Sequence, residues 1–393
     1  MHGRLKFDIS WRSLLWAATG PPVPEATVAA ARNRLTAAFG QGAVVVGLSV
    51  RTLFDAILGE LALPAGTAVV MSGVNIANMS DIVRAHGLSI EAVDIDADRL
   101  SPAPAALRRA VTGSEARICV VAQLFGAVED TIEPETRGGC LVIEDAAQAF
   151  AGDFYRGGGA DVSLFSFGPI KRHTALGGAV AVFRDRALAN RVQGRIDAYR
   201  PLSELWFRRR ALKYVALTVL STPWAYGAMA RIAAWRGRDL DAVIGGVARG
   251  FSGGGLLAAI RRRLPKRMVA LLSRQVARAG RVRERQRLCE AFIDGLPPSA
   301  RVGSGVQRHA YWLMPVLARD PDAVVARLRA AGFDATRGQT SLRAFDAERT
   351  PAARRLIDQI VYLPHPAQMT DKARRRLQQA VIAALAASSA SSS

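Results

Sequence analysis

A carboxylate and a lysine follow two strand-like runs, where their side chains could meet. The apolar run 141–143 leads into Glu144 and Asp145, and the run 162–167 comes shortly before Lys171. Short apolar runs of this kind are typical of the buried strands of a parallel sheet. Open α/β sheets bind ligands at the carboxyl ends of their strands. We therefore expect Asp145 and Lys171 to converge at one edge of a sheet.

A lysine and a carboxylate at such an edge suit pyridoxal phosphate. The lysine holds the aldehyde as a Schiff base, and the carboxylate pairs with the protonated pyridine nitrogen so that the ring acts as an electron sink. Taken singly, an Asp at a strand end is more often a cap or turn residue, and a Lys is usually a solvated surface charge. The ordered set Asp145, Gln148, Ser166 and Lys171 favours cofactor binding.

These residues also resemble a known family. Glu144-Asp145-Ala146-Ala147-Gln148-Ala149, followed by Ser166-Phe167 and Lys171, is similar to the motif of the DegT/DnrJ-type sugar aminotransferases, a branch of the fold-type-I pyridoxal-phosphate enzymes. Weaker similarities lie at 121–126, at Arg267-Met268 and at 362–366, so that the resemblance covers 20–190 and 265–385.

The resemblance implies a role for each residue of the set. Asp145 would meet the pyridine nitrogen of the cofactor, and Gln148 would lie beside the ring hydroxyl. Ser166 would bind the phosphate, and Lys171 would carry the covalent link. Some relatives have a histidine in place of the lysine and are sugar dehydratases. The lysine here favours transamination.

The phosphate end departs from the family pattern. Ser49-Val50-Arg51-Thr52 stands where the family has Ser-Gly-Thr, just before a helix-like stretch. Helix N-termini attract phosphate through free N–H groups and the macrodipole, so we expect Arg51 and Thr52 to bind the cofactor there. Ile76 stands where the family often stacks an aromatic ring, and would cover the cofactor with an apolar side chain. Pro265 replaces an Asn that reaches the partner subunit's phosphate in the family.

The resemblance implies ping-pong transamination in a homodimer. An amino-acid donor, by resemblance glutamate, would pass its amine to a keto-sugar or related ketone. Lys171 would move the proton as general base and then as general acid. His173 and Arg343 are candidates for binding an anionic group of the substrate, although a His in such a loop is more often solvated.

Hydrophobic patterning predicts an α/β protein, and the resemblance implies the fold-type-I transferase fold. Strand-like runs alternate with helix-like stretches in the first half, which favours a mainly parallel sheet in a large domain. A second α/β unit follows, with 311–317 expected as one of its strands. The expected units are a large domain (1–189), a basic, apolar helical insertion (190–263), a connecting helix (264–292), a small C-terminal domain (293–386) and a disordered tail (387–393).

The middle of the chain carries most of its positive charge. Between Asn190 and Glu290 there are 22 Lys and Arg against 6 Asp and Glu, a local net charge of +16 out of +20. The same segment holds an uncharged apolar run at 214–230, with Trp224, Tyr226 and Trp235 in or near it. A basic cluster, an apolar run and such aromatic residues suit attachment of 200–260 to an anionic membrane surface.

Other interpretations of the insertion stay open. A membrane-spanning helix is disfavoured by the shortness of the run and by Pro223 and Gly227 within it. The helices could instead pack against the core or a second subunit, with the arginines as a solvated face. Nucleic-acid binding would fit the charge, but no recognised nucleic-acid module is visible.

Cysteine usage and the N-terminus indicate a cytoplasmic protein, at the inner face of the membrane if the insertion docks there. Cys119, Cys140 and Cys289 are too widely spaced for a disulfide framework or a metal site. The apolar patch 11–19 is short and contains Arg12, so it predicts an ordinary helix and not a signal peptide.

Two further hypotheses about the function stay open. If the insertion docks on lipid, the ketone acceptor could be lipid-linked. A different class also stays open: a degenerate, non-catalytic aminotransferase fold that acts as a membrane-associated scaffold or regulator. The missing Asn, and the absence of the acidic residue that the family carries after the lysine, leave room for it.

Overall fold

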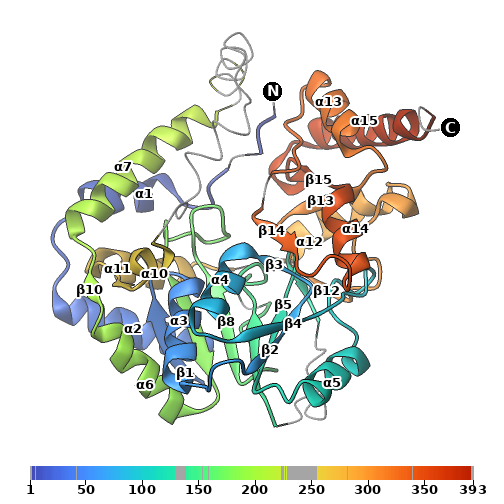
Figure 1. Ribbon diagram of the computed structural model, residues 1–393. Coiled ribbons are helices and arrows are strands. Elements are labelled where there is room, and N and C mark those ends of the chain that lie inside the picture. Colours follow the sequence, from blue (N-terminus) through green and yellow to red (C-terminus); the bar gives the residue numbers. More distant parts are fainter. Residues whose placement is uncertain are drawn as a thin grey trace.

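The computed structural model describes the chain except for residues 1, 5, 41, 130–138, 153, 158, 223, 224, 226, 228–254, 281, 339 and 391–393. Figure 1 shows a large domain around a central sheet, and a smaller domain, coloured orange and red, beside it. The predicted α/β architecture of a large and a small domain is confirmed.

A seven-stranded sheet forms the centre of the large domain. Its strand order is β1-β9-β8-β7-β5-β2-β4, and β9 alone among these strands runs antiparallel to its neighbours. The apolar runs of the sequence lie in these strands, which confirms the mainly parallel sheet. The bounds are β1 Ala43–Gly47, β2 Ala68–Ser72, β4 Ser89–Val93, β5 Ile118–Ala122, β7 Leu141–Asp145, β8 Val162–Ser166 and β9 Ala179–Phe183.

Helices cover both faces of this sheet. Successive side chains of a strand face opposite sides: Val120 and Ile143 pack in one apolar cluster with residues of α3, α4 and α6, whereas Cys119 and Val142 pack in another with α5. A third cluster joins the β8–β9 end of the sheet to α2, α11 and α7 (Glu204–Leu220). The strands are therefore apolar on both sides. The helix bounds are α1 Trp11–Thr19, α2 Glu25–Phe39, α3 Val50–Leu61, α4 Ala77–Ala85, α5 Pro104–Gly113, α6 Arg186–Asp197 and α11 Lys266–Ala277.

The small domain packs four helices around the antiparallel pair β13–β15 and touches the large domain through short strand pairs. β14 pairs with β3, and β12 pairs with β6. These pairings join segments more than 170 residues apart in the sequence. The bounds are β3 Val74–Ile76, β6 Ala127–Val128, α12 Arg283–Asp294, η2 Pro298–Ala300, β12 Arg308–His309, β13 Met314–Leu317, α13 Pro321–Ala330, β14 Leu342–Ala344, α14 Pro351–Gln359, β15 Ile360–Leu363, η3 Pro366–Gln368 and α15 Asp371–Ala390.

Three predicted boundaries are wrong. The connecting helix expected over 264–292 is two helices, α11 and α12, because the chain breaks around Gly280. The strand expected over 311–317 begins only at Met314, since Tyr311 has a positive φ of 48° that no strand allows. The C-terminal helix runs to Ala390, so the tail expected to be disordered from 387 is helical over most of its length.

The described ends of the insertion are helical. It contains α7 (Glu204–Leu220), which packs along α1, then α10 (Leu256–Ile260), and the short strands β10 (Arg200–Pro201) and β11 (Arg262–Arg263). Within the described residues, no helix is long and apolar enough to cross a membrane. Trp224, Tyr226 and Trp235, predicted as interfacial aromatics, lie outside the described residues.

A buried carboxylate ties the returning end of the insertion to α3. Asp55 accepts hydrogen bonds from Arg261 Nε and Nη2 (both 2.9 Å), from His86 Nε2 (2.9 Å) and from the Tyr199 hydroxyl (3.3 Å). Burial opposes the charge of Asp55, but the hydrogen bonds of His86 and Arg261 outweigh it and lower the pKa to about 2.

Arg261→Gln should lower the free energy of unfolding by about 3 kcal/mol at pH 7, because it leaves a buried carboxylate under-compensated. The folded-state pKa of Asp55 is depressed, so its stabilisation is present above about pH 4 and is lost as the pH falls through about 2. The difference between the two proteins should shrink over that range. Urea unfolding followed by circular dichroism measures it, with Arg262→Gln as control. Equal stability of all three proteins at pH 7 would contradict the analysis.

Candidate active site

Asp145 is the last residue of β7, and its carboxylate is buried at the C-terminal edge of the sheet. It is 7% exposed, and its Oδ1 accepts a hydrogen bond from the backbone N–H of Ala147 at 3.1 Å. Burial raises its pKa, while that hydrogen bond and the charges of Lys171 and Arg51 favour the ionised form. A positively charged partner stabilises the ionised form of a carboxylate in this setting.

Lys171 lies in the turn that follows β8, beside Asp145. Its backbone N–H donates to the carbonyl of Gly168 at 2.9 Å, which fixes the turn. Burial lowers the pKa of Lys171 to about 7, with the charge of Asp145 opposing that shift and the charge of Arg51 adding to it. The predicted convergence of Asp145 and Lys171 at the sheet edge is therefore present, and Arg51 joins them.

The N-terminus of α3 supplies Arg51. Ser49 caps the helix by accepting from the N–H of Thr52 at 3.2 Å. Arg51 donates to Asn78 Oδ1 at 2.7 Å, and burial lowers its pKa against the attraction of Asp145. The Thr52 hydroxyl donates to the carbonyl of Ile260 at 2.9 Å. Thr52 thus braces α3 against α10, and its expected contact with a phosphate stays a prediction.

Gln148 follows β7, and Ser166 ends the neighbouring strand β8. Gln148 Oε1 accepts from the backbone N–H of Phe125 at 2.8 Å, which ties it to the loop after β5. Ser166 ends β8, and its Oγ accepts from the N–H of Gly168 at 3.4 Å. The Ser166 hydroxyl hydrogen has no acceptor in the described part of the chain, so it remains available to a ligand.

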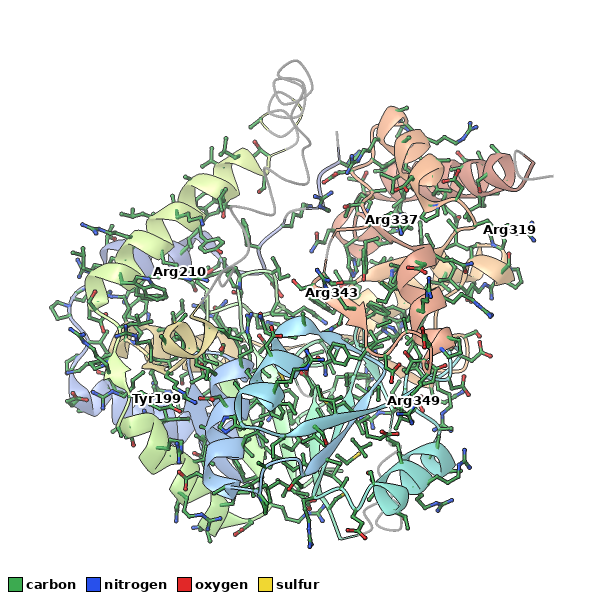
Figure 2. All side chains as sticks on the ribbon, viewed as in Figure 1. Tyr199, Arg210, Arg319, Arg337, Arg343 and Arg349 are labelled. Carbon is green, nitrogen blue, oxygen red and sulfur yellow. The ribbon has the colours of Figure 1, made fainter. Side chains whose placement is uncertain are left out.

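The pairing of β3 with β14 brings Ile76 and Arg343 together. Ile76 lies opposite Leu342, and Arg343 lies opposite Asn75; Figure 2 places Arg343 where the two domains meet. Asn75 is 1% exposed, and its side-chain amide lies within reach of the Asp145 carboxylate. Its amide favours the charged form of Asp145. Sequence reasoning missed Asn75, whose signal was a polar residue inside an apolar strand.

His173 points toward the N-terminal segment. Its backbone N–H donates to Asp8 Oδ2 at 3.0 Å, and its ring packs edge-on against Phe150. Burial lowers its pKa, with the charge of Asp8 opposing. His173 Nε2 is buried without an acceptor in the described part of the chain. Its expected contact with substrate stays a prediction.

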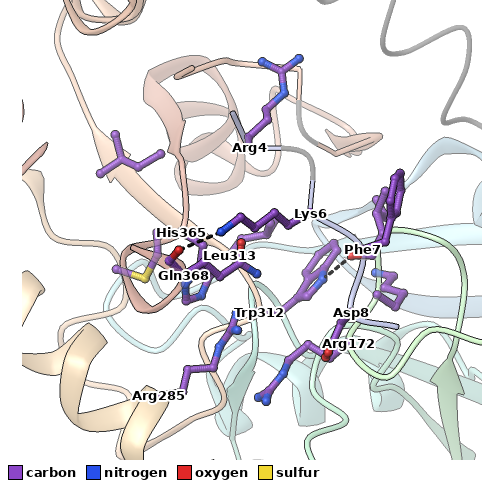
Figure 3. Close-up of a pocket in the computed structure, with 14 residues that line it drawn as sticks. Arg4, Lys6, Phe7, Asp8, Arg172, Arg285, Trp312, Leu313, His365 and Gln368 are labelled. Atoms are coloured by element: carbon purple, nitrogen blue, oxygen red, sulfur yellow. Dashed lines mark hydrogen bonds between the residues drawn. The ribbon is translucent and has the colours of Figure 1, made fainter. Parts of the chain in front are cut away.

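Trp312, from the small domain, covers the lysine. Lys171 Nζ lies 3.5 Å from the centroid of a Trp312 ring, and Trp312 Nε1 donates to the carbonyl of Ile170 at 3.0 Å. No local signal identified Trp312, because the contact joins two domains. Beside it lies a pocket between the N-terminal segment, the Lys171 turn and the small domain, shown in Figure 3.

Several solved structures share this fold along nearly the whole chain. The sugar aminotransferase CalS13 from Micromonospora echinospora superposes with a TM-score of 0.67 at 20% identity, over 98% of this chain and 100% of that one. A DegT DnrJ EryC1 StrS aminotransferase from Brucella abortus gives 0.68 at 18% identity, over 94% of each. GDP-4-keto-6-deoxy-D-mannose-3-dehydratase of E. coli, solved with bound hydrated PLP, gives 0.67 at 15% identity, over 94% and 96%. Likeness at these identities establishes the fold and not the reaction.

The sequence of the large domain is more specific. Residues 36–200 match the DegT/DnrJ/EryC1/StrS aminotransferase family. This segment holds Arg51, Asp145, Gln148, Ser166 and Lys171, the residues gathered at the sheet edge. Residues 36–200 are therefore similar in sequence to the DegT/DnrJ/EryC1/StrS aminotransferase family, and the chain shares its fold with solved aminotransferases.

Proposed function

We infer that the protein is a pyridoxal-phosphate-dependent aminotransferase. The observation that carries this conclusion is the convergence of Asp145, Lys171 and Arg51 at the strand edge of an aminotransferase-family domain. A non-catalytic scaffold would have no use for a buried lysine amine beside a buried carboxylate, whose separate burial costs free energy.

The residues present fit pyridoxal phosphate. The cofactor, when bound, supplies an aldehyde for a covalent link and a ring that withdraws electrons. Asp145 would face the ring nitrogen, because a buried carboxylate of raised pKa gains from a protonated nitrogen. Lys171 would carry the covalent link, and Gln148 would fix the tilt of the ring. The free hydroxyl of Ser166 would hold the phosphate.

The side of the phosphate away from Ser166 would face α3. Arg51 and the N-terminus of that helix, with Thr52, provide positive charge and N–H groups there. Ile76 would cover one face of the ring with an apolar side chain. These roles are supported by the family match and by the placement of the residues around one edge.

Lys171 is suited to move protons. With a pKa of about 7, its amine exists in both forms near neutral pH. Once released by the incoming amino donor, it could take a proton from the substrate Cα as a base and return one as an acid. A lysine with its ordinary pKa would be protonated almost completely and would be a poor base.

The acceptor we propose is a keto-sugar or a related ketone, with glutamate as the amino donor. Support comes from the similar structures, which include a sugar aminotransferase, an aminotransferase and a GDP-4-keto-6-deoxy-D-mannose-3-dehydratase. Arg343 and His173 remain proposed contacts to an anionic group of the substrate, and a homodimer remains the proposed assembly.

We also propose that the insertion attaches the enzyme to an anionic membrane surface, where the acceptor would be lipid-linked. Leu205, Leu212 and Val219 of α7 are spaced by seven residues and so share one helix face, with exposures of 55%, 52% and 46%. Lys213 and Arg209 are exposed near this stripe. Apolar side chains flanked by cations favour the surface of an anionic bilayer.

Lys171→Ala should abolish cofactor attachment. The purified wild-type protein incubated with pyridoxal phosphate should show an absorbance band at about 410–430 nm, typical of a lysine-linked cofactor. The variant should lack this band. Lys213→Ala, which removes an exposed lysine, is the matched control. A band that persists in Lys171→Ala after gel filtration would rule out the assignment of the lysine.

The rate at which cofactor-free protein takes up pyridoxal phosphate should rise with pH around a midpoint near 7, since the neutral amine of Lys171 is the nucleophile. The charge of Asp145 raises this pKa and that of Arg51 lowers it. Asp145→Asn should therefore move the midpoint to lower pH, and Arg51→Gln should move it to higher pH. Stopped-flow absorbance measures the profile. Shifts in the opposite directions would refute the proposed electrostatic coupling.

Leu212→Asp with Val219→Asp should reduce co-sedimentation with vesicles of anionic lipid by about tenfold, because the double change places two charges on the apolar stripe. Neutral vesicles control for nonspecific adsorption, and activity on a soluble acceptor should not change. If the stripe is a subunit interface instead, the wild type will not sediment with vesicles, and the double variant will dissociate in analytical ultracentrifugation.

A further inference from the structure

The pocket beside Lys171 is lined by an unusual concentration of cations. Arg172 and Arg285 reach it from the Lys171 turn and from α12, and Lys6 reaches it from the N-terminal segment. Arg4 also lines the pocket, but its charge is paired with Asp334. The one carboxylate in the lining belongs to Asp8.

Arg285 is held by a backbone carbonyl and has no acidic partner among the described residues. Its Nε and Nη2 donate to the carbonyl of Tyr311 at 3.1 and 2.8 Å, and His365 Nε2 donates to the same carbonyl at 2.8 Å. Burial lowers the pKa of Arg285 to about 10, and the charge of Arg172 adds to that shift. A guanidinium fixed by a carbonyl keeps its full charge to offer to a ligand.

Arg172 leaves hydrogen-bonding capacity unused. Its Nη1 donates to the carbonyl of Ala310 at 3.3 Å, while its Nε is buried with no acceptor in the described part of the chain. Burial lowers its pKa, and the charge of Asp8 opposes that shift. A buried donor without an acceptor is costly, so a ligand that supplies an oxygen would stabilise the site.

The charges of the pocket do not balance. Lys6 donates to the carbonyl of Gln368 at 2.8 Å, and it has no carboxylate partner in the part of the chain that the structure describes. Asp8 is 47% exposed at its side chain and is already engaged by the N–H of His173. Two guanidinium groups and an ammonium thus face one partly solvated carboxylate. His365 adds no charge, because its Nδ1 accepts a hydrogen bond from the N–H of Ala367 and its Nε2 donates.

We propose that Arg172, Arg285 and Lys6 form a subsite for an oxyanion of the substrate, a carboxylate of the amino donor or a phosphate of the acceptor. Guanidinium groups bind either through paired N–H···O⁻ hydrogen bonds. Because Lys171 and Trp312 line the same pocket, a substrate anchored there would bring its amine or carbonyl toward the lysine. This orientation rests on the proposed function, whereas the binding of the anion does not.

Binding is tested without turnover. Isothermal titration of the cofactor-free protein with glutarate, an unreactive dicarboxylate, and separately with inorganic phosphate should detect at least one of them. Arg172→Gln and Arg285→Gln should each weaken the binding of that probe at least tenfold. Arg287→Gln, which removes the same charge from an exposed position of α12, should leave it unchanged. Wild-type protein that binds neither probe at millimolar concentration, or variants that bind as tightly as the wild type, would overturn the proposal.

A second measurement uses the wild type alone and is unaffected by misfolding of a variant. Phenylglyoxal modifies accessible arginines, and peptide mass spectrometry reports each site. The bound probe should slow modification of Arg172 and Arg285 at least fivefold and leave Arg287 unaffected. Protection absent at both arginines would refute the subsite. If the wild type shows this protection but no transaminase activity, the subsite stands and the proposed reaction is refuted.

Steady-state kinetics distinguishes the two sources of the anion, the donor carboxylate and the acceptor phosphate. If the subsite holds the donor carboxylate, Arg285→Gln should raise the KM for glutamate at least tenfold with little change in the KM for the acceptor. If it holds a phosphate of the acceptor, the pattern should be reversed. Unchanged KM values for both substrates would place the subsite outside the reaction and so contradict its proposed role.

Discussion

The site depends on opposite charges that are buried together. Asp145 and Lys171 would each be costly to bury alone, and each lowers the cost of the other. Their environment shifts both pKa values toward the neutral forms, which leaves the amine available as a nucleophile and base. Arg51 strengthens the effect on Lys171 while it favours the charge of Asp145. The parallel sheet makes this possible, because its strand ends deliver residues from β7 and β8 to one edge.

The small domain completes what the sheet edge begins. Trp312 lies over the Lys171 amine, and the β14–β3 pairing places Arg343 beside Asn75. The pocket with Arg172 and Arg285 lies on the same side. The large domain thus provides the groups suited to a cofactor, and the interface between the domains provides those suited to a substrate.

The insertion is joined to the same site through α3. The Thr52 hydroxyl bonds the carbonyl of Ile260, and Arg261 pairs with Asp55 one turn further along that helix. Both contacts belong to the segment that returns from the insertion. The helix whose N-terminus carries Arg51 is therefore braced by the residues that follow the insertion.

The sequence by itself determined the alternation of strands and helices and the convergence of Asp145 with Lys171. Both follow from local patterns, since an apolar run predicts a buried strand and a parallel sheet brings its carboxyl ends together. Trp312 and Arg285 could not be identified in this way. Their roles arise from contacts between segments far apart in the chain, and a single tryptophan or arginine has no local signature of what it will face. Tertiary structure alone decided them, because only packing brings the small domain against the lysine.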